Sequence, residues 1–176
     1  MSLTTLDIKE PGLNILPPGV ERHVVNAGGL TGLQIFPDDE IEIINDEGNQ
    51  ICEIICFDKE GKSELAILNL KENSNKSFIK EILKKKDESS LATNFQLKKR
   101  NLDLNKSHSS ILFDEKTPSG EKIKLKSKDK CYVIFSAPQN DMLVSEQNPS
   151  SDLTIFIKRA KIVNDKELSI IPDPIY

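Results

Sequence analysis

Short apolar runs alternating with polar positions dominate the chain and predict β-strands. The clearest block runs from Pro37 to Phe57, where β-branched and aromatic residues flank a turn-rich segment at 45–49. This pattern predicts two antiparallel strands joined as a hairpin. Their apolar runs are nearly continuous, which is typical of a sheet covered on both faces or of a closed barrel. Further strands are expected at residues 21–26, 31–36, 63–70, 110–113, 121–126, 130–138 and 152–160.

Between residues 74 and 105 the apolar spacing becomes helical. A first helix is expected after Ser77, a suitable N-cap, and a second, weaker one from Ser90 to Lys99. The second helix is expected to bury Leu91, Ala92 and Phe95. We therefore predict a mainly β (α+β) fold, an antiparallel barrel-like or sandwich domain with a helical insert near residues 74–105.

The distribution of prolines and glycines suggests three parts. Residues 1–19 contain Pro11-Gly12 and Pro17-Pro18-Gly19, which favour an extended N-terminal arm. Residues 20–163 are expected to form a single β-rich domain that includes the insert. Residues 164–176 end in Pro172-Asp-Pro-Ile-Tyr176, which is typical of an extended linker towards a C-terminal region.

Composition narrows the classes of protein. The 176 residues fit one domain, and with 37% hydrophobic and 30% charged residues the chain is too apolar for disorder and too polar for a membrane protein. Its net charge of -4 makes nucleic acid an unsuitable partner. The N-terminus lacks a signal pattern, so a cytoplasmic location is expected. The oligomeric state is left open.

Two histidines, His23 and His108, are the candidates for a metal site. A metal-binding barrel usually needs two or three imidazoles together with a carboxylate. Because His23 falls in a predicted strand and His108 in a polar loop, we expect ordinary edge or surface histidines and no metal. The alternative left open is a freestanding, cupin-like, metal-dependent small-molecule enzyme that uses both histidines.

Three cysteines, Cys52, Cys56 and Cys131, match no paired metal-binding or disulfide pattern, and we expect reduced thiols. Cys52 and Cys56 are four residues apart, so on a strand they face the same side. Apolar neighbours favour buried, unreactive side chains. The neighbouring carboxylates of Glu53 and Asp58 would also raise the pKa values of these two thiols.

Charged residues gather in two further places. One is a run of lysines at every second position, which predicts a solvated strand face or a protected edge strand: Lys122, Lys124, Lys126, Lys128 and Lys130. This run leaves a protein-interaction module with an acidic partner as a third functional alternative. The other is a group of acidic residues in one turn: Asp38, Asp39, Glu40 and Glu42. Their spacing is not that of a calcium-binding loop, so we interpret them as ordinary polar residues of a turn.

Several motifs occur in a distinctive order: Glu21-Arg-His-Val-Val, Gly28-Gly29, Pro37-Asp38-Asp39, Asp46-Glu-Gly-Asn-Gln50, Cys52-Glu53, Phe57-Asp58, Ala137-Pro138 with Met142, Asp152-Leu, Ile157-Lys-Arg-Ala160 and Pro172-Asp-Pro174. Together they resemble the N-terminal region of large multidomain aminomethyltransferase-like proteins related to the glycine cleavage T-protein. The hairpin is also similar to the urea-carboxylase-associated family.

This resemblance implies a non-catalytic N-terminal accessory domain of a transferase of one-carbon metabolism. Tetrahydrofolate would be the cofactor of the parent protein, and the C-terminal domains of that parent would be the partners. No catalytic residue is carried over to this chain, and cofactor-binding residues stay unassigned.

Overall fold

A computed structural model describes residues 16–74, 77–85, 87–139 and 150–161. Most of the predicted N-terminal arm and the whole of the predicted linker 164–176 lie outside these residues. The division into arm, domain and linker therefore stays a prediction. Within the described part, no helix is both long enough and apolar enough to cross a membrane.

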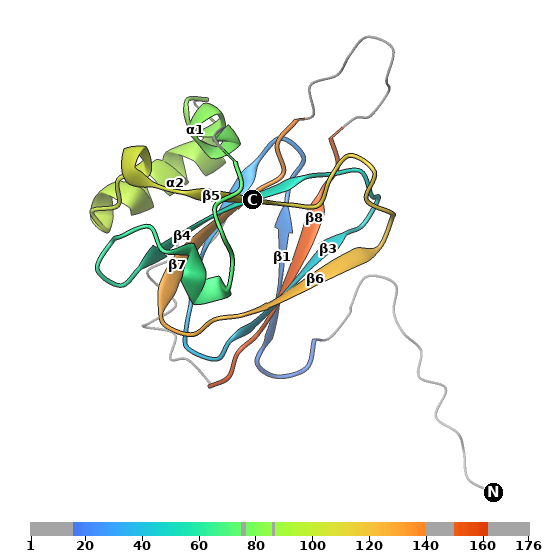
Figure 1. The fold of residues 1–176 in the computed structure, drawn as a ribbon, viewed down its shortest axis with the longest axis horizontal. Coiled ribbons are helices and arrows are strands. Elements are labelled where there is room, and N and C mark those ends of the chain that lie inside the picture. Colours follow the sequence, from blue (N-terminus) through green and yellow to red (C-terminus); the bar gives the residue numbers. More distant parts are fainter. Residues whose placement is uncertain (1–15, 75–76, 86, 140–149, 162–176) are drawn as a thin grey trace, which may run out of the picture.

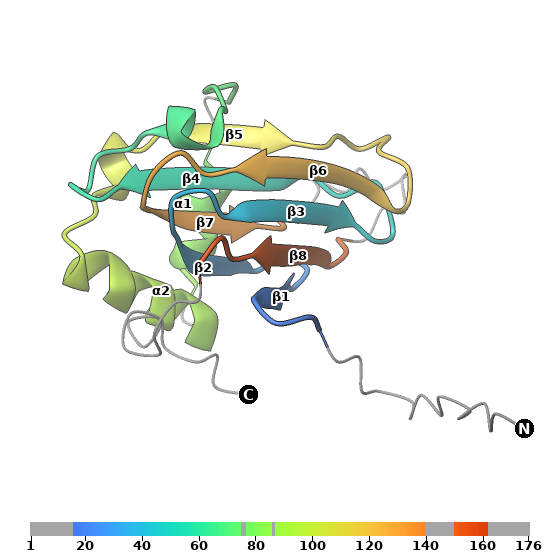
Figure 2. The same ribbon diagram turned by 90° about the horizontal axis from the view of Figure 1, so that it is seen from below.

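Two four-stranded antiparallel sheets lie face to face, which confirms the predicted sandwich (Figure 1). The first has the strand order β1-β8-β3-β6 and the second β2-β7-β4-β5. Figure 2 shows β1 and β2 at one side of the sandwich and β5 and β6 at the other. The strands are β1 (Val20–Val25), β2 (Leu30–Ile35), β3 (Glu40–Asn45), β4 (Cys52–Asp58), β5 (Ser109–Leu112), β6 (Glu121–Lys126), β7 (Cys131–Ser136) and β8 (Leu153–Lys158).

The predicted hairpin is wrong in its pairing, although both of its strands exist. β3 pairs with β6 and β8, whereas β4 pairs with β5 and β7 in the other sheet. The segment between them crosses from one sheet to the other, held by a hydrogen bond from Asn45 Nδ2 to the Gln50 carbonyl of 2.7 Å. Local turn residues predicted a reversal of the chain, but burial of both apolar strands decided their partners.

The strand predicted at 63–70 is also wrong. Residues Leu65–Leu68 form a 3-10 helix, η1, and bury Leu65, Ile67 and Leu68. The carboxylate of Glu64 accepts from the amide of Ala66, and Asn69 ends the turn with a φ of 56°. A polar cap and a left-handed asparagine are both signals for a helical turn.

The helical insert is confirmed. It contains α1 (Phe78–Leu83), α2 (Glu88–Lys99) and a 3-10 turn, η2 (Leu104–Lys106). Ser77 is the N-cap of α1, as predicted, and its Oγ accepts from the amide of Lys80 at 3.3 Å. Figure 1 shows both α-helices beside the β2-β7-β4-β5 sheet, on the side away from the other sheet.

The buried face of α2 differs from the prediction. Leu91 and Phe95 are 57% and 62% exposed, while Ser90, Thr93, Gln96 and Leu97 are buried. The reason is polar: Ser90 Oγ donates to the Ile82 carbonyl and Asn94 Nδ2 donates to the Leu83 carbonyl. These bonds satisfy carbonyl groups at the end of α1, and they turn the polar side of α2 inward.

Apolar side chains form two cores, one on each face of the β2-β7-β4-β5 sheet. Ile54, Cys56 and Phe135 belong to the core between the two sheets. Ile55 and Phe57 belong to the core beneath the helical insert. This explains the nearly continuous apolar sequence of β4, because both of its faces are covered.

Gly48 allows a close backbone approach in the segment between β3 and β4, and we expect its replacement by alanine to destabilise the protein. Its φ is 80°, and an added Cβ would lie 2.7 Å from the backbone at Thr117 and Ser119. Gly120 is a matched control, with the same φ and no atom within 4 Å of an added Cβ. In urea unfolding, Gly48→Ala should lose about 1–2 kcal/mol more than Gly120→Ala. Equal losses would show that the close approach has no energetic consequence.

Candidate functional site

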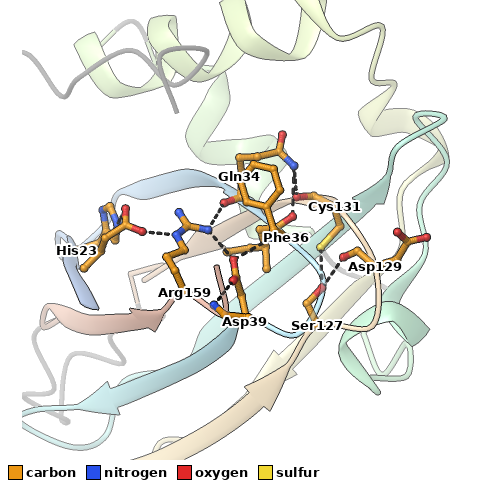
Figure 3. Close-up of polar contacts among 11 residues, drawn as sticks. His23, Gln34, Phe36, Asp39, Ser127, Asp129, Cys131 and Arg159 are labelled. Carbon is orange, nitrogen blue, oxygen red and sulfur yellow. Dashed lines mark hydrogen bonds and ion pairs between the residues drawn. The ribbon is translucent and has the colours of Figure 1, made fainter. Parts of the chain in front are cut away.

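A buried arginine organises a cluster of charged side chains at one end of the sandwich (Figure 3). Arg159 directly follows β8, Glu21 lies in β1, and Asp39 lies in the turn between β2 and β3. All three belong to motifs that stood out in the sequence. The fold therefore brings together motifs that are up to 138 residues apart.

The guanidinium of Arg159 contacts two carboxylates. Its Nε donates to Glu21, and its Nη1 donates to Asp39 Oδ2 at 2.7 Å and to the Gln34 carbonyl at 2.8 Å. The side chains of Arg159 and Asp39 are only 4% and 1% exposed. Asp39 also accepts from the amides of Phe36 and Ala160, each at 2.9 Å. Asp39 is therefore a buried ion-pair partner of Arg159 and not an exposed turn residue.

These contacts shift the pKa values of the pair. Burial by itself would raise the pKa of Glu21, but its contact with His23 and its hydrogen bond with Arg159 outweigh it and lower the pKa to about 2. Burial by itself would lower the pKa of Arg159, but its hydrogen bonds to Glu21 and Asp39 raise it. The charged pair is thus the stable form. Nη2 of Arg159 is buried and has no hydrogen-bond partner among the described residues.

A second arginine joins this cluster to the helical insert. Gln34 Nε2 donates to the Cys131 carbonyl at 2.8 Å, and its Oε1 accepts from Arg100 Nη1 at 2.5 Å. The Arg100 guanidinium lies over the ring of Tyr132, 4.6 Å from the centroid. Burial lowers the pKa of Arg100 and raises the pKa of Tyr132 to about 12. Arg100 therefore fixes the end of α2 to the sheet.

The opposite end of the sandwich uses another of the motif residues, Gln50. Gln50 Nε2 donates to the Pro138 carbonyl at 2.8 Å, and its Oε1 accepts from the amide of Ser151 at 2.9 Å. Gln50 is fully buried. At both ends of the sandwich, then, these buried polar side chains form hydrogen bonds with other groups of the same chain and hold its strands and loops in place.

The two histidines do not meet. His23 lies in β1 with its Nε2 3.5 Å from Glu21, whereas His108 precedes β5 with its Nδ1 3.0 Å from Glu72. β1 is an edge strand of one sheet and β5 an edge strand of the other, and they lie at opposite sides of the sandwich (Figure 2). Among the residues that the structure describes, no three His, Cys, Asp or Glu side chains are grouped to hold a metal ion. The cupin-like arrangement of His23 and His108 is therefore wrong.

The cysteines are free and buried, as predicted. Cys52 and Cys56 point into the same core between the sheets. Burial raises the pKa of Cys52, and the neighbouring Glu53 adds to this rise. A hydrogen bond with Cys131 and burial raise the pKa of Cys56. Neither thiol is in a setting that activates a nucleophile.

Lys122, Lys124 and Lys126 lie on the exposed side of β6, an edge strand, which confirms that interpretation of their spacing. Lys128 and Lys130 are exposed after the strand has ended. Glu42 of β3 lies 3.7 Å from both Lys122 and Lys124 and offsets part of their charge. Glu42 and Asp39 therefore have separate partners, so the acidic turn does not converge on one ion. An interaction module with an acidic partner stays a prediction.

No protein-family model matches the sequence. The chain is similar to trimethylamine-oxide aldolase of Ruegeria pomeroyi, with 32% identity over 168 residues. The similarity covers 96% of this chain, and the chain spans about a fifth (21%) of the length of that relative.

This similarity corrects the family expectation. The relative is named an aldolase, so the predicted membership of the aminomethyltransferase-like proteins is wrong, together with the transferase and one-carbon functions that it implied. The partner domains of such a parent lose their support for the same reason. An aldolase relative favours the enzyme alternative over a non-catalytic accessory domain. Tetrahydrofolate as a cofactor stays an untested prediction, and the metal dependence of the enzyme alternative is also untested.

Proposed function

We propose that this chain forms a β-sandwich domain of an enzyme that cleaves a small methylated amine oxide in an aldolase-type reaction. The supporting observation is the 32% identity to trimethylamine-oxide aldolase over nearly the whole of this chain. A match of this extent includes both ends of the sandwich and the insert, so it concerns the complete domain and not one motif.

The proposed reaction breaks one carbon–nitrogen bond. In trimethylamine oxide the only carbon groups are methyls, so the aldehyde released is formaldehyde. The nitrogen–oxygen bond and one methyl carbon–hydrogen bond break as well, that carbon forms the carbonyl with the released oxygen, and the hydrogen moves to nitrogen to leave dimethylamine. Atoms and electrons balance without an added oxidant or reductant.

The geometry supports a positioning contribution from this domain. Arg159 and Gln50 fix the two ends of the sandwich, and Arg100 and Glu53 fix the insert to the sheet. Buried, mutually bonded polar groups hold a single arrangement of their surroundings. A domain built in this way can present its surface to a substrate or to neighbouring catalytic groups without rearrangement.

Incubating the intact gene product with trimethylamine oxide tests the proposal. We expect formaldehyde and dimethylamine in equal amounts, measured by NMR, and no reaction with trimethylamine, which lacks the oxygen. Heat-unfolded protein is the control for uncatalysed breakdown. Parallel samples treated with a chelator and then resupplied with Zn²⁺ or Fe²⁺ measure metal dependence separately. Absence of both products in every sample would contradict the proposal.

A further inference from the structure

The outer side of α2 is an exposed apolar surface formed by Leu91, Ala92 and Phe95, here called the α2 outer face. Leu91 and Phe95 are the exposed large hydrophobic residues among those that the structure describes, at 57% and 62%. They are four positions apart, so they lie next to each other on one side of the helix. The hydrogen bonds to α1 fix the opposite side inward, and the helix cannot rotate to bury this face.

Charges of opposite sign border the α2 outer face at its two ends. Asp87 and Glu88 lie at the start of the helix, and Lys98 and Lys99 lie at its end. All four are exposed. The apolar and charged residues are spaced symmetrically about position 93. Leu91 and Phe95 are each two residues from it, Glu88 and Lys98 are each five residues from it, and Asp87 and Lys99 are each six residues from it.

We propose that the α2 outer face binds the same face of a second copy of the chain, with the two helices antiparallel around a twofold axis near position 93. In this arrangement Leu91 of one copy packs against Phe95 of the other. The acidic start of each helix meets the basic end of its partner. A self-complementary surface of this kind closes into a dimer and does not propagate.

The pattern favours a second copy over a different partner. A purely basic or acidic partner would match one end of the face and be repelled at the other, whereas a second copy matches both ends. The face is small, because three side chains fall short of the roughly 800 Å² per partner that a stable interface buries. We therefore expect weak association, with a Kd on the order of 100 µM.

Sedimentation of the intact chain from about 10 µM to 1 mM tests the dimer, at concentrations that bracket the expected Kd. Phe95→Asp should weaken association at least about tenfold, without lowering the thermal midpoint, because the side chain is already mostly exposed. Asn105→Asp is the control: it adds the same charge at an exposed position in η2, outside α2. A monomer at every concentration, or equal effects of the two variants, would overturn the proposal.

Charge reversal tests the antiparallel orientation. Lys98→Glu and Glu88→Lys should each weaken the dimer by placing like charges opposite each other. The double variant restores opposite charges at both ends, and we expect it to recover most of the lost affinity. Two single losses that merely add in the double variant would overturn the orientation.

Cross-linking gives an independent measure. The three natural cysteines are buried, so Leu91→Cys and Phe95→Cys introduce the accessible thiols of the described chain. Under mild oxidation, a mixture of these two variants should give mainly the mixed disulfide. Equal amounts of mixed and like-with-like products would contradict the antiparallel packing.

Discussion

Replacing Arg159 by alanine is expected to lower the free energy of unfolding by about 3–5 kcal/mol, the usual result of removing one partner from a buried ion pair. The change leaves Asp39 fully buried with its cation gone. It also removes the hydrogen bonds that join β1, β8 and the turn after β2. One end of the sandwich would lose its main polar connection.

Urea unfolding monitored by circular dichroism measures this loss. Lys158→Ala is the matched control, because it removes a neighbouring cation from an exposed position. Arg159→Lys should be intermediate, since it keeps the charge but cannot contact both carboxylates with a planar group. A loss in Arg159→Ala no larger than in Lys158→Ala would mean that the cluster contributes little to stability.

The dependence of stability on acid pH measures the other ion pair of Arg159, which it forms with Glu21. Glu21 has an ordinary pKa of 4.5 and a folded-state pKa of about 2. A lowered folded-state pKa stabilises the protein above 4.5, and this contribution is lost as the pH falls from 4.5 to 2. For a partly exposed group we expect a loss of about 1–2 kcal/mol in the wild type. Glu21→Gln should remove most of this slope.

The cluster around Arg159 could have been found in the sequence by following, along each strand and just past its ends, the alternation of inward-facing and outward-facing side chains. Ile41 and Ile43 face the core, so Asp39 has the inward parity. Leu153, Ile155 and Ile157 also face the core, which gives Arg159 the inward parity, and Val25 does the same for Glu21. Two inward acids and one inward arginine predict an ion pair. What the sequence could not supply was that β1, β3 and β8 are neighbours in one sheet.

The strands and the insert were predictable because local hydrophobic spacing determines them. Their partners were not, because pairing depends on which surfaces can be buried together. β3 and β4 show this clearly: both were expected, yet they belong to different sheets. The orientation of α2 fails for a related reason, since hydrogen bonds from Ser90 and Asn94 to α1 outweigh the burial of Leu91 and Phe95.

Replacing Glu53 by alanine is expected to lower the free energy of unfolding by about 2–4 kcal/mol, because it leaves two buried donors unpaired. Glu53 is fully buried beneath the insert. Its Oε2 accepts from the amide of Ile79 at 2.8 Å, and its Oε1 accepts from Ser109 Oγ at 2.6 Å. The side chain thus holds the start of α1 against β4 and β5.

Glu53→Gln separates the hydrogen bonds from the charge. The amide oxygen can accept from Ile79, and the amide nitrogen can donate to Ser109 Oγ. We expect this variant to stay within about 1 kcal/mol of the wild type at pH 7. Glu60→Gln, a change at an exposed carboxylate, is the control.

The pH dependence has the opposite sign to that of Glu21. Burial raises the pKa of Glu53 above its ordinary value of 4.5, against the hydrogen bonds that it accepts. The folded state then holds this proton more tightly than the unfolded state, so stability falls as the pH rises from 4.5 through the raised pKa. Glu53→Gln should remove this fall, and hydrogen exchange should show faster opening of α1 in Glu53→Ala. An unchanged pH slope in Glu53→Gln would show that Glu53 does not hold its proton more tightly in the folded protein.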